Sequence, residues 1–200
     1  MNPSADELHG VLAFLRAAES LKHTTRTSWT STGQHETVAA HTWRVCLMAL
    51  VLAPYFPDVD VGRLLRICLV HDLGEAISGD ISAVLQAGMP SKAEQERADL
   101  EQLTTPLPLT TREEIVALWD EYEQASTPEA RLAKGIDKLE TILQHNQGMM
   151  PPDFDFRFNL QYGARYTADE PLLRAIRSVL DEETEARARE QAREQARERE

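Results

Sequence analysis

The chain has 200 residues, a formal net charge of −12 and 42% hydrophobic residues. This length suits one compact domain with a substantial core, which needs no stabilising disulfide or metal. The excess of 33 acidic over 21 basic residues argues against binding to a nucleic acid polymer, because such binding requires a basic surface. A small phosphorylated substrate is compatible with this charge, since a metal and a few basic side chains can make one pocket positive.

The cysteines and the apolar runs bear on the cellular compartment. Cys46 and Cys68 lie far apart within apolar stretches, which indicates buried thiols in a reducing environment rather than a disulfide framework. The polar first ten residues are unlike a signal peptide. The longest apolar run, 45–53, is shorter than a membrane span. The sequence therefore predicts a cytoplasmic protein that does not enter a membrane.

Apolar residues recur at helical spacing along most of the chain and predict an all-α bundle. The expected helices cover about 8–21, 37–53, 61–75, 91–103, 115–122, 132–143 and 171–180. The third of them is strongly apolar and is expected near the centre. Residues 22–36 are polar and are expected to form a loop, and 76–91 an irregular connection. No window alternates every two residues, so no sheet is expected.

The C-terminal residues differ in composition from the rest. From Glu182 onward there is no aromatic residue and no aliphatic one larger than alanine, and 188–198 repeat the pattern AREQ. A coiled coil is excluded because no apolar seam exists. We therefore expect a single helical domain over 1–181 and a charged tail over 182–200 that is a frayed helix or disordered.

Four ionisable residues stand on or beside helices that are predicted to be apolar: His41, His71, Asp72 and Asp137. Burying such groups without a partner is costly, and a bound cation removes that cost. Imidazole and carboxylate together suit Mn, Fe, Co, Ni or Zn better than Mg or Ca alone. The pattern predicts one divalent cation site and leaves the metal, Mg included, open. The alternative is that each residue is an ordinary hydrogen-bonded side chain.

Glu75 has an argument of its own. It follows His71 by four residues and Asp72 by three, so a helix that continues through 75 places all three on one face. There Glu75 could bind a metal or act as a general acid or base. The alternative is a solvated glutamate at a helix end.

Five ordered segments carry a resemblance to a known family. They are RTSW at 26–29, HETVAAHTWRV at 35–45, LVHDLGEAISGDI at 69–81, LWDEYE at 118–123 and KGIDKLETILQ at 134–144. Together they resemble the HD-domain superfamily of metal-dependent phosphohydrolases, and more narrowly its 5'-deoxynucleotidase branch. The resemblance implies an HD-domain helical bundle that binds a first cation through the four residues above. It also implies a second, weaker cation on Glu75, Asp80 and the backbone carbonyl of Ile81. A turn-forming role is the alternative for Asp80, which follows Ser78-Gly79.

The resemblance also implies substrate-binding residues. Arg26 corresponds to the family's substrate arginine, whose forked donors match phosphate oxygens. Trp29 either stacks on a base or packs on the core. The tryptophan that directly follows this arginine in bacterial members is replaced here by Thr27, which leaves the sugar preference open. Lys138 could contact phosphate or face solvent, and Asp80 is a further candidate to bind the substrate.

The function so implied is hydrolysis of (deoxy)nucleoside 5'-monophosphates by metal-activated water, with Arg26, Asp72 and Glu75 as catalytic residues. One alternative is an HD phosphohydrolase acting on cyclic nucleotides or (p)ppGpp-like substrates. Another is a non-catalytic metal- or nucleotide-binding protein. Relatives are commonly homodimers, so a homodimer is expected. Six further residues are expected to be structural: His9, His23, His35 and His145 on the surface, and Trp119 and Tyr122 in the core.

Overall fold

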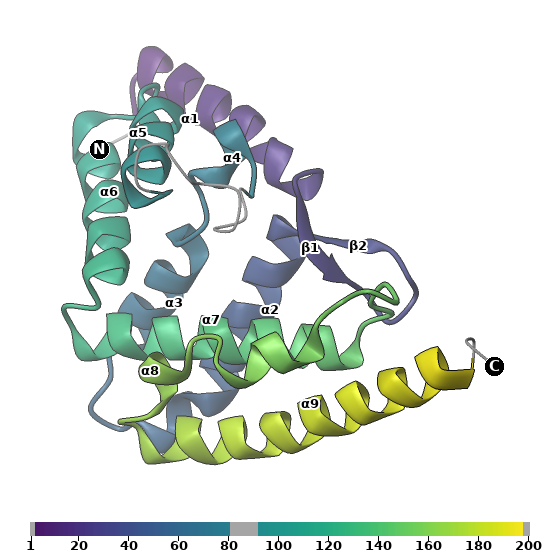
Figure 1. Ribbon diagram of the computed structural model, residues 1–200. Coiled ribbons are helices and arrows are strands. Elements are labelled where there is room, and N and C mark those ends of the chain that lie inside the picture. The colour runs from purple at the N-terminus through teal and green to yellow at the C-terminus, as the bar shows by residue number, and fades with distance from the viewer. Residues whose placement is uncertain (1–2, 81–91, 198–200) are drawn as a thin grey trace.

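The computed structural model describes residues 3–80 and 92–197 and forms a bundle of helices (Figure 1). The α-helices are α1 Ala5–Ala18, α2 Val38–Leu52, α3 Val61–Val70, α4 Glu75–Ser78, α5 Lys92–Thr104, α6 Leu109–Gln124, α7 Pro128–Gln147, α8 Ala164–Thr167 and α9 Pro171–Arg197. Short 3-10 helices are η1 Glu19–Lys22, η2 Ala53–Tyr55 and η4 Phe156–Leu160, and the strands are β1 Thr25–Trp29 and β2 His35–Thr37. The predicted all-α class is confirmed. Ile81, named above, lies outside the described residues.

Helix α7 is the centre of the bundle and contacts α2, α3, α6 and α9 (Figure 1). Its apolar face buries Ile136, Leu139 and Ile142 completely. These side chains join Leu64 and Ile67 of α3 in one apolar core. Each fully buried aliphatic side chain of this size contributes about 1.5–3 kcal/mol through the hydrophobic effect. The core therefore fixes α2, α3 and α7 relative to one another, and the ionisable candidates lie on these helices or directly after them.

The expectation that residues 22–36 form only a loop, and that the chain has no sheet, is wrong. Strands β1 and β2 pair antiparallel, with Thr25 opposite Thr37 and Trp29 opposite His35. Buried and exposed side chains do alternate along the strands, but the inward-facing ones are hydrophilic. Ser28 and Glu36 are both buried. A search for alternating apolar residues cannot detect such a hairpin. Its inner face points polar groups toward α7.

The third helix is shorter than predicted. It ends at Val70, residues 71–74 form turns, and α4 begins at Glu75. A Cβ at Gly74 would lie 2.5 Å from the carbonyl oxygen of Glu96, so the missing side chain allows α5 to approach the turn closely. His71 and Glu75 are therefore not on one continuous helix.

Helix α9 continues without a break past 182, the position where we expected the tail to begin. Thr184 is completely buried and donates a hydrogen bond to Asn146 Oδ1 at 2.9 Å. Gln191 donates to the carbonyl oxygen of Pro152 at 2.9 Å. The first part of the charged segment is thus helical and packs against the end of α7 and the loop after it.

Helix α2 carries a second apolar face that the core does not cover. Its large exposed side chains, together with one from η2, are Trp43, Leu47, Leu50, Val51 and Tyr55. By length and composition alone, the window Val38–Tyr55 is apolar enough to cross a membrane, with a mean hydropathy of 1.3. This window is longer than the uninterrupted apolar run 45–53. Its inner side buries His41, Val45 and Ala49 within the bundle.

Candidate metal centre

The fold brings together the four residues that the sequence analysis selected as ligands. His41 comes from α2, His71 and Asp72 from the turn after α3, and Asp137 from α7. His41 Nε2 lies 3.2 Å from Asp137 Oδ1 and 3.6 Å from Asp72 Oδ2. His71 Nε2 lies 3.1 Å from Asp72 Oδ2 and 4.0 Å from Asp137 Oδ1. Two imidazole nitrogens and two carboxylate oxygens therefore converge on one point.

The hydrogen bonds of the two histidines fit a metal at this point. His71 Nδ1 donates to the carbonyl oxygen of Cys68 at 2.7 Å, and His41 Nδ1 donates to Glu140 Oε2. Each ring thus carries a proton on Nδ1 and turns Nε2 inward. Both Nε2 atoms are buried and have no hydrogen-bond partner. Burial and the charge of Arg26 lower the pKa of His41, but the carboxylates of Asp137 and Glu140 outweigh them and raise that pKa to about 9. A divalent cation, which this donor set suits, would therefore bind at Nε2 in place of a proton.

The two carboxylates are ionised. Burial by itself would raise the pKa of Asp72, but His71, His41 and Arg26 together hold that pKa well below its ordinary value. Burial opposes ionisation of Asp137 in the same way, and Lys138 and His41 bring its pKa well below the ordinary value. Charged oxygens are the form that binds a cation, so both side chains are ready to act as ligands.

Glu140 supports His41 from behind. It is completely buried, and its second oxygen, Oε1, accepts a hydrogen bond from Arg44 Nε at 2.6 Å. Glu36, His41 and Glu140 also lie close enough together to form a metal-ligand group. However, the Glu140 oxygens are already taken by Arg44 and by the Nδ1 proton of His41. We therefore assign Glu140 the role of orienting His41, a role that the sequence analysis did not give it.

Glu75 and Asp80 lie beside the four ligands. Burial and the charges of Asp72 and Asp80 together raise the pKa of Glu75 to about 9, so this carboxyl group keeps its proton at neutral pH. The ammonium group of Lys92 lies 3.8 Å from Glu75 Oε1 and 3.8 Å from Asp80 Oδ1. The structure thus places Glu75 at the site although the helix that suggested it ends at Val70.

The predicted substrate residues fall into two groups. Arg26 Nη1 donates to Asp72 Oδ2 at 3.3 Å, and Nη2 donates to Thr141 Oγ1 at 3.2 Å. Lys138 Nζ lies 2.8 Å from Asp137 Oδ2. Both side chains line the same cavity as the ligands His71, Asp72 and Asp137. Trp29 does not line it; its ring lies against His35, with the ring centroids 4.2 Å apart.

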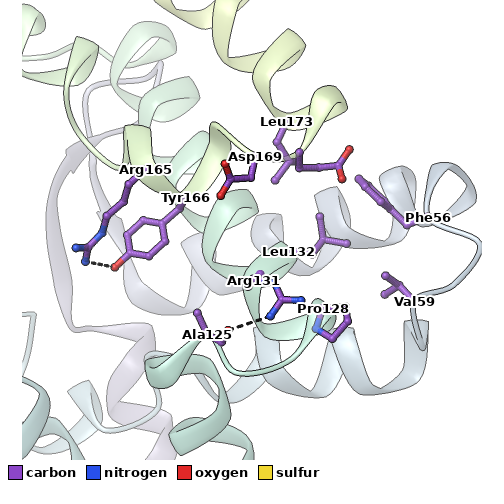
Figure 2. Close-up of a pocket in the computed structure, with 11 residues that line it drawn as sticks. Phe56, Val59, Ala125, Pro128, Arg131, Leu132, Arg165, Tyr166, Asp169 and Leu173 are labelled. Atoms are coloured by element: carbon purple, nitrogen blue, oxygen red, sulfur yellow. Dashed lines mark hydrogen bonds between the residues drawn. The ribbon is translucent and has the colours of Figure 1, made fainter.

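This cavity has a volume of about 310 Å³, a size that suits a small ligand. Its polar walls include Arg26, Asp72, Glu75, Asp80, Lys92, Asp137 and Lys138. A cavity of about 360 Å³ lies elsewhere, between η2, the start of α7 and α8, where Figure 2 shows Phe56, Leu132, Tyr166 and Leu173 around it. None of the predicted site residues that the structure describes lines that cavity. The candidate active site is therefore the cavity of about 310 Å³.

The roles of Tyr122 and His145 at the site were also missed from the sequence. Tyr122 was expected in the core; it is buried there, but it also lines the cavity and donates to Asp137 Oδ2 at 2.7 Å. His145 was expected on the surface, and this is wrong. It is buried, lines the cavity and lies 3.1 Å from Ser28 Oγ. Its position four residues after Thr141 and eight after Asp137, on one face of α7, was the signal for it. The other three histidines of the surface group, His9, His23 and His35, are exposed as expected.

The fold and the site together define an all-helical domain whose converging imidazoles and carboxylates can hold a divalent cation. The chain belongs to the HD domain family, because the sequence model of that family matches residues 18–177. This family membership implies a divalent metal.

The chain is also similar to proteins of known name. A mouse (Mus musculus) protein, 5'-deoxynucleotidase HDDC2, is 36% identical over 140 residues, which are 69% of each chain. The 5'-deoxynucleotidase hdd1 of Schizosaccharomyces pombe is 36% identical over 140 residues, covering 67% of this chain and 70% of that one. Among solved structures, a predicted metal-dependent phosphohydrolase from Magnetospirillum magnetotacticum superposes with a TM-score of 0.78 at 29% identity. That match covers 94% of this chain and 97% of the other.

Proposed function

We propose that the protein is a metal-dependent phosphomonoesterase that hydrolyses (deoxy)nucleoside 5'-monophosphates to nucleoside and phosphate. One observation carries this proposal. The two unpartnered Nε2 atoms of His41 and His71 face ionised Asp72 and Asp137, and Arg26 lies in the same cavity, 3.3 Å from Asp72. A cation site beside a fixed guanidinium is an arrangement suited to a phosphate group. The named relatives support the same activity.

His41, His71, Asp72 and Asp137 would hold the cation. When bound there, a divalent cation neutralises charge on the phosphate and makes water more acidic. Two imidazoles among the donors favour Mn, Fe, Co, Ni or Zn over Mg or Ca. Glu75 and Asp80 remain the candidates for a second, weaker cation, which would have to displace the Lys92 ammonium and the proton of Glu75.

The protein's own side chains account for the remaining steps. Arg26 turns its forked donors from Asp72 and Thr141 to the phosphate oxygens and orients the ester. Water adds to phosphorus as the bond to the 5'-oxygen breaks. Glu75, which is protonated at neutral pH, gives its proton to the leaving oxygen. The proton lost by the attacking water restores Glu75, so the net reaction is hydrolysis. No protein nucleophile is needed.

A substrate panel with phosphate detection tests the proposal. The purified protein, loaded separately with Mn, Co, Ni, Zn or Mg, is given deoxynucleoside and ribonucleoside 5'-monophosphates, a cyclic nucleotide and a pyrophosphate substrate such as ppGpp. We expect phosphate release from the monophosphates and its loss in Asp72→Ala. Turnover of only the cyclic or pyrophosphate substrate favours the rival enzyme. Binding without turnover of any substrate favours a non-catalytic nucleotide-binding protein.

We also propose that the protein is a cytoplasmic homodimer, paired through the uncovered face of α2. Trp43 and Val51 on that face and Tyr55 on η2 directly after it are 65%, 62% and 69% exposed, an unusual grouping of large exposed apolar side chains. Light scattering of Val51→Glu tests the pairing, with Val179→Glu on α9 as the control. A dimer that persists in Val51→Glu contradicts this interface.

A further inference from the structure

We propose that Phe158 and Tyr162 form the nucleobase-binding wall of the cavity, on which the base of the substrate stacks. This inference rests on the proposed function, because it assigns a place to one part of that substrate. Both residues line the cavity that three of the four metal ligands, His71, Asp72 and Asp137, also line. They come from η4 and the turn after it, a segment to which the sequence analysis assigned no role.

The cavity changes from charged to aromatic along one line of contacts. Asp137 Oδ2 lies 2.8 Å from Lys138 Nζ, and Lys138 Nζ donates to Tyr162 Oη at 3.3 Å. The Tyr162 ring in turn lies beside that of Phe158, with the centroids 5.4 Å apart and the planes inclined by 34°. A nucleotide has the same order of chemistry, with a charged phosphate at one end and a flat base at the other. Phosphate at the cation site therefore directs the base toward these rings.

Phe158 has an open ring. Its residue is 52% exposed although it lines the cavity. Two other aromatic residues of the same segment are covered: Phe154 packs edge-on against His145, and buried Phe156 packs edge-on against Phe154. An exposed phenyl face gains free energy when a flat ligand covers it, and stacking of a base on an aromatic side chain contributes about 1–3 kcal/mol. Trp29, for which the sequence left base stacking or core packing open, does not line the cavity.

The wall is held in place before any ligand binds. Arg177 donates from Nη1 to the carbonyl oxygen of Tyr162 at 2.8 Å and from Nη2 to that of Asn159 at 2.6 Å. Gly163 adopts a positive φ of 65°, and a Cβ there would lie 2.5 Å from Lys138 Cγ. The glycine thus lets the turn approach Lys138 closely. A rigid wall loses little conformational entropy when the base binds.

Stacking does not depend on base identity, because every base has a π face. We therefore expect the protein to accept all four deoxynucleoside monophosphates, with purines favoured by their larger face.

Kinetics on a ligand with a base and on one without it test the wall. The holoenzyme hydrolyses dAMP in the presence of 2-deoxyribose 5-phosphate as a competitor. In Phe158→Ala we expect the KM for dAMP to rise about 10-fold, with kcat little changed, as loss of one stacking contact requires. The inhibition constant of 2-deoxyribose 5-phosphate should stay within about twofold of the wild-type value, because that ligand has no base to stack.

Two variants and one control complete the design. Phe158→Trp keeps a flat ring and should retain the wild-type KM, whereas Phe158→Leu keeps only apolar bulk and should resemble the alanine variant. Arg157→Ala changes an exposed neighbour that does not line the cavity and should leave both constants unchanged. If Phe158→Ala raises the KM for dAMP and the inhibition constant of 2-deoxyribose 5-phosphate equally, or changes neither, the proposal that the base stacks on this wall is wrong. A wild type that releases no phosphate from dAMP contradicts the proposed function instead, and calorimetric titration of dAMP into both proteins then measures the wall separately.

Discussion

The guanidinium of Arg26 donates a hydrogen bond to Asp72 Oδ2 across 3.3 Å and so joins β1 to the turn after α3. Arg26 also lies 3.5 Å from buried Glu36 through Nε. Its orientation is therefore set by two carboxylates, one of which is a proposed metal ligand. The β1–β2 hairpin, which was not predicted from the sequence, is the element that brings the proposed phosphate-binding arginine to the cation site.

Replacing Arg26 by lysine keeps the charge but loses the forked geometry. We expect kcat/KM for dAMP to fall on the order of 100-fold, because a single ammonium cannot reproduce the paired donors. Steady-state kinetics measure this, with Arg66→Lys, an exposed arginine on α3, as the control. A lysine variant as active as the wild type would show that Arg26 does not clamp the phosphate.

Glu140→Gln should weaken metal binding. The amide no longer holds the Nδ1 proton of His41 through a charged oxygen, so the Nε2 lone pair is a poorer and less well oriented ligand. Loss of such a supporting carboxylate raises the metal dissociation constant by about 10- to 100-fold. Titration with Mn or Co measures this constant, and Glu114→Gln, which removes a half-exposed carboxylate, is the control. Unchanged affinity in Glu140→Gln would rule out the supporting role.

Glu75→Gln removes the proposed proton donor. We expect kcat to fall by about 10²- to 10⁴-fold. The acid form is the active one, and the pKa of Glu75 is raised to about 9. Wild-type kcat should therefore hold at neutral pH and decrease as the pH rises through about 9, and this alkaline limb should be missing from the residual activity of the variant. A limb that persists in Glu75→Gln assigns the titration to another group.

Gly163→Ala should destabilise the protein. The position has a positive φ, which costs an alanine about 1–2 kcal/mol, and the new methyl group would collide with Lys138. Chemical unfolding measures the free-energy change, and the KM for dAMP should rise as well because Tyr162 follows the displaced turn. Gly62→Ala, where a Cβ meets only one carboxylate oxygen at 3.2 Å, is the comparison. Equal stability of the two variants would contradict this reading of the turn.

Truncation separates the packed part of α9 from its free end. A chain ending at 181 loses the buried Thr184 and its hydrogen bond to Asn146, so we expect its free energy of unfolding to fall by about 1–3 kcal/mol. A chain ending at 192 keeps this contact and should lose less. Denaturant titration of the two chains compares them. If the chain ending at 181 is as stable as the full chain, the domain ends where the sequence analysis placed it.

Helices were predictable because apolar side chains repeat at their period, and α2, α3 and α7 carry such patterns over long stretches. The four ligands were predictable because ionisable groups stood out within those apolar patterns. The hairpin was missed because its buried residues are polar, and the end of α3 was missed because the bend at Gly74 depends on the approach of α5. The aromatic wall could not be found from the sequence, since nothing in local spacing links Phe158 to Asp137.

X-ray diffraction from a crystal soaked in Mn, with anomalous scattering used to locate the ion, tests the central claim most directly. We expect one strong peak within bonding distance of the Nε2 atoms of His41 and His71 and of carboxylate oxygens of Asp72 and Asp137. The peak should vanish in Asp137→Ala. An ion bound elsewhere, with these four side chains left without metal, would contradict the proposed centre and the chemistry built on it.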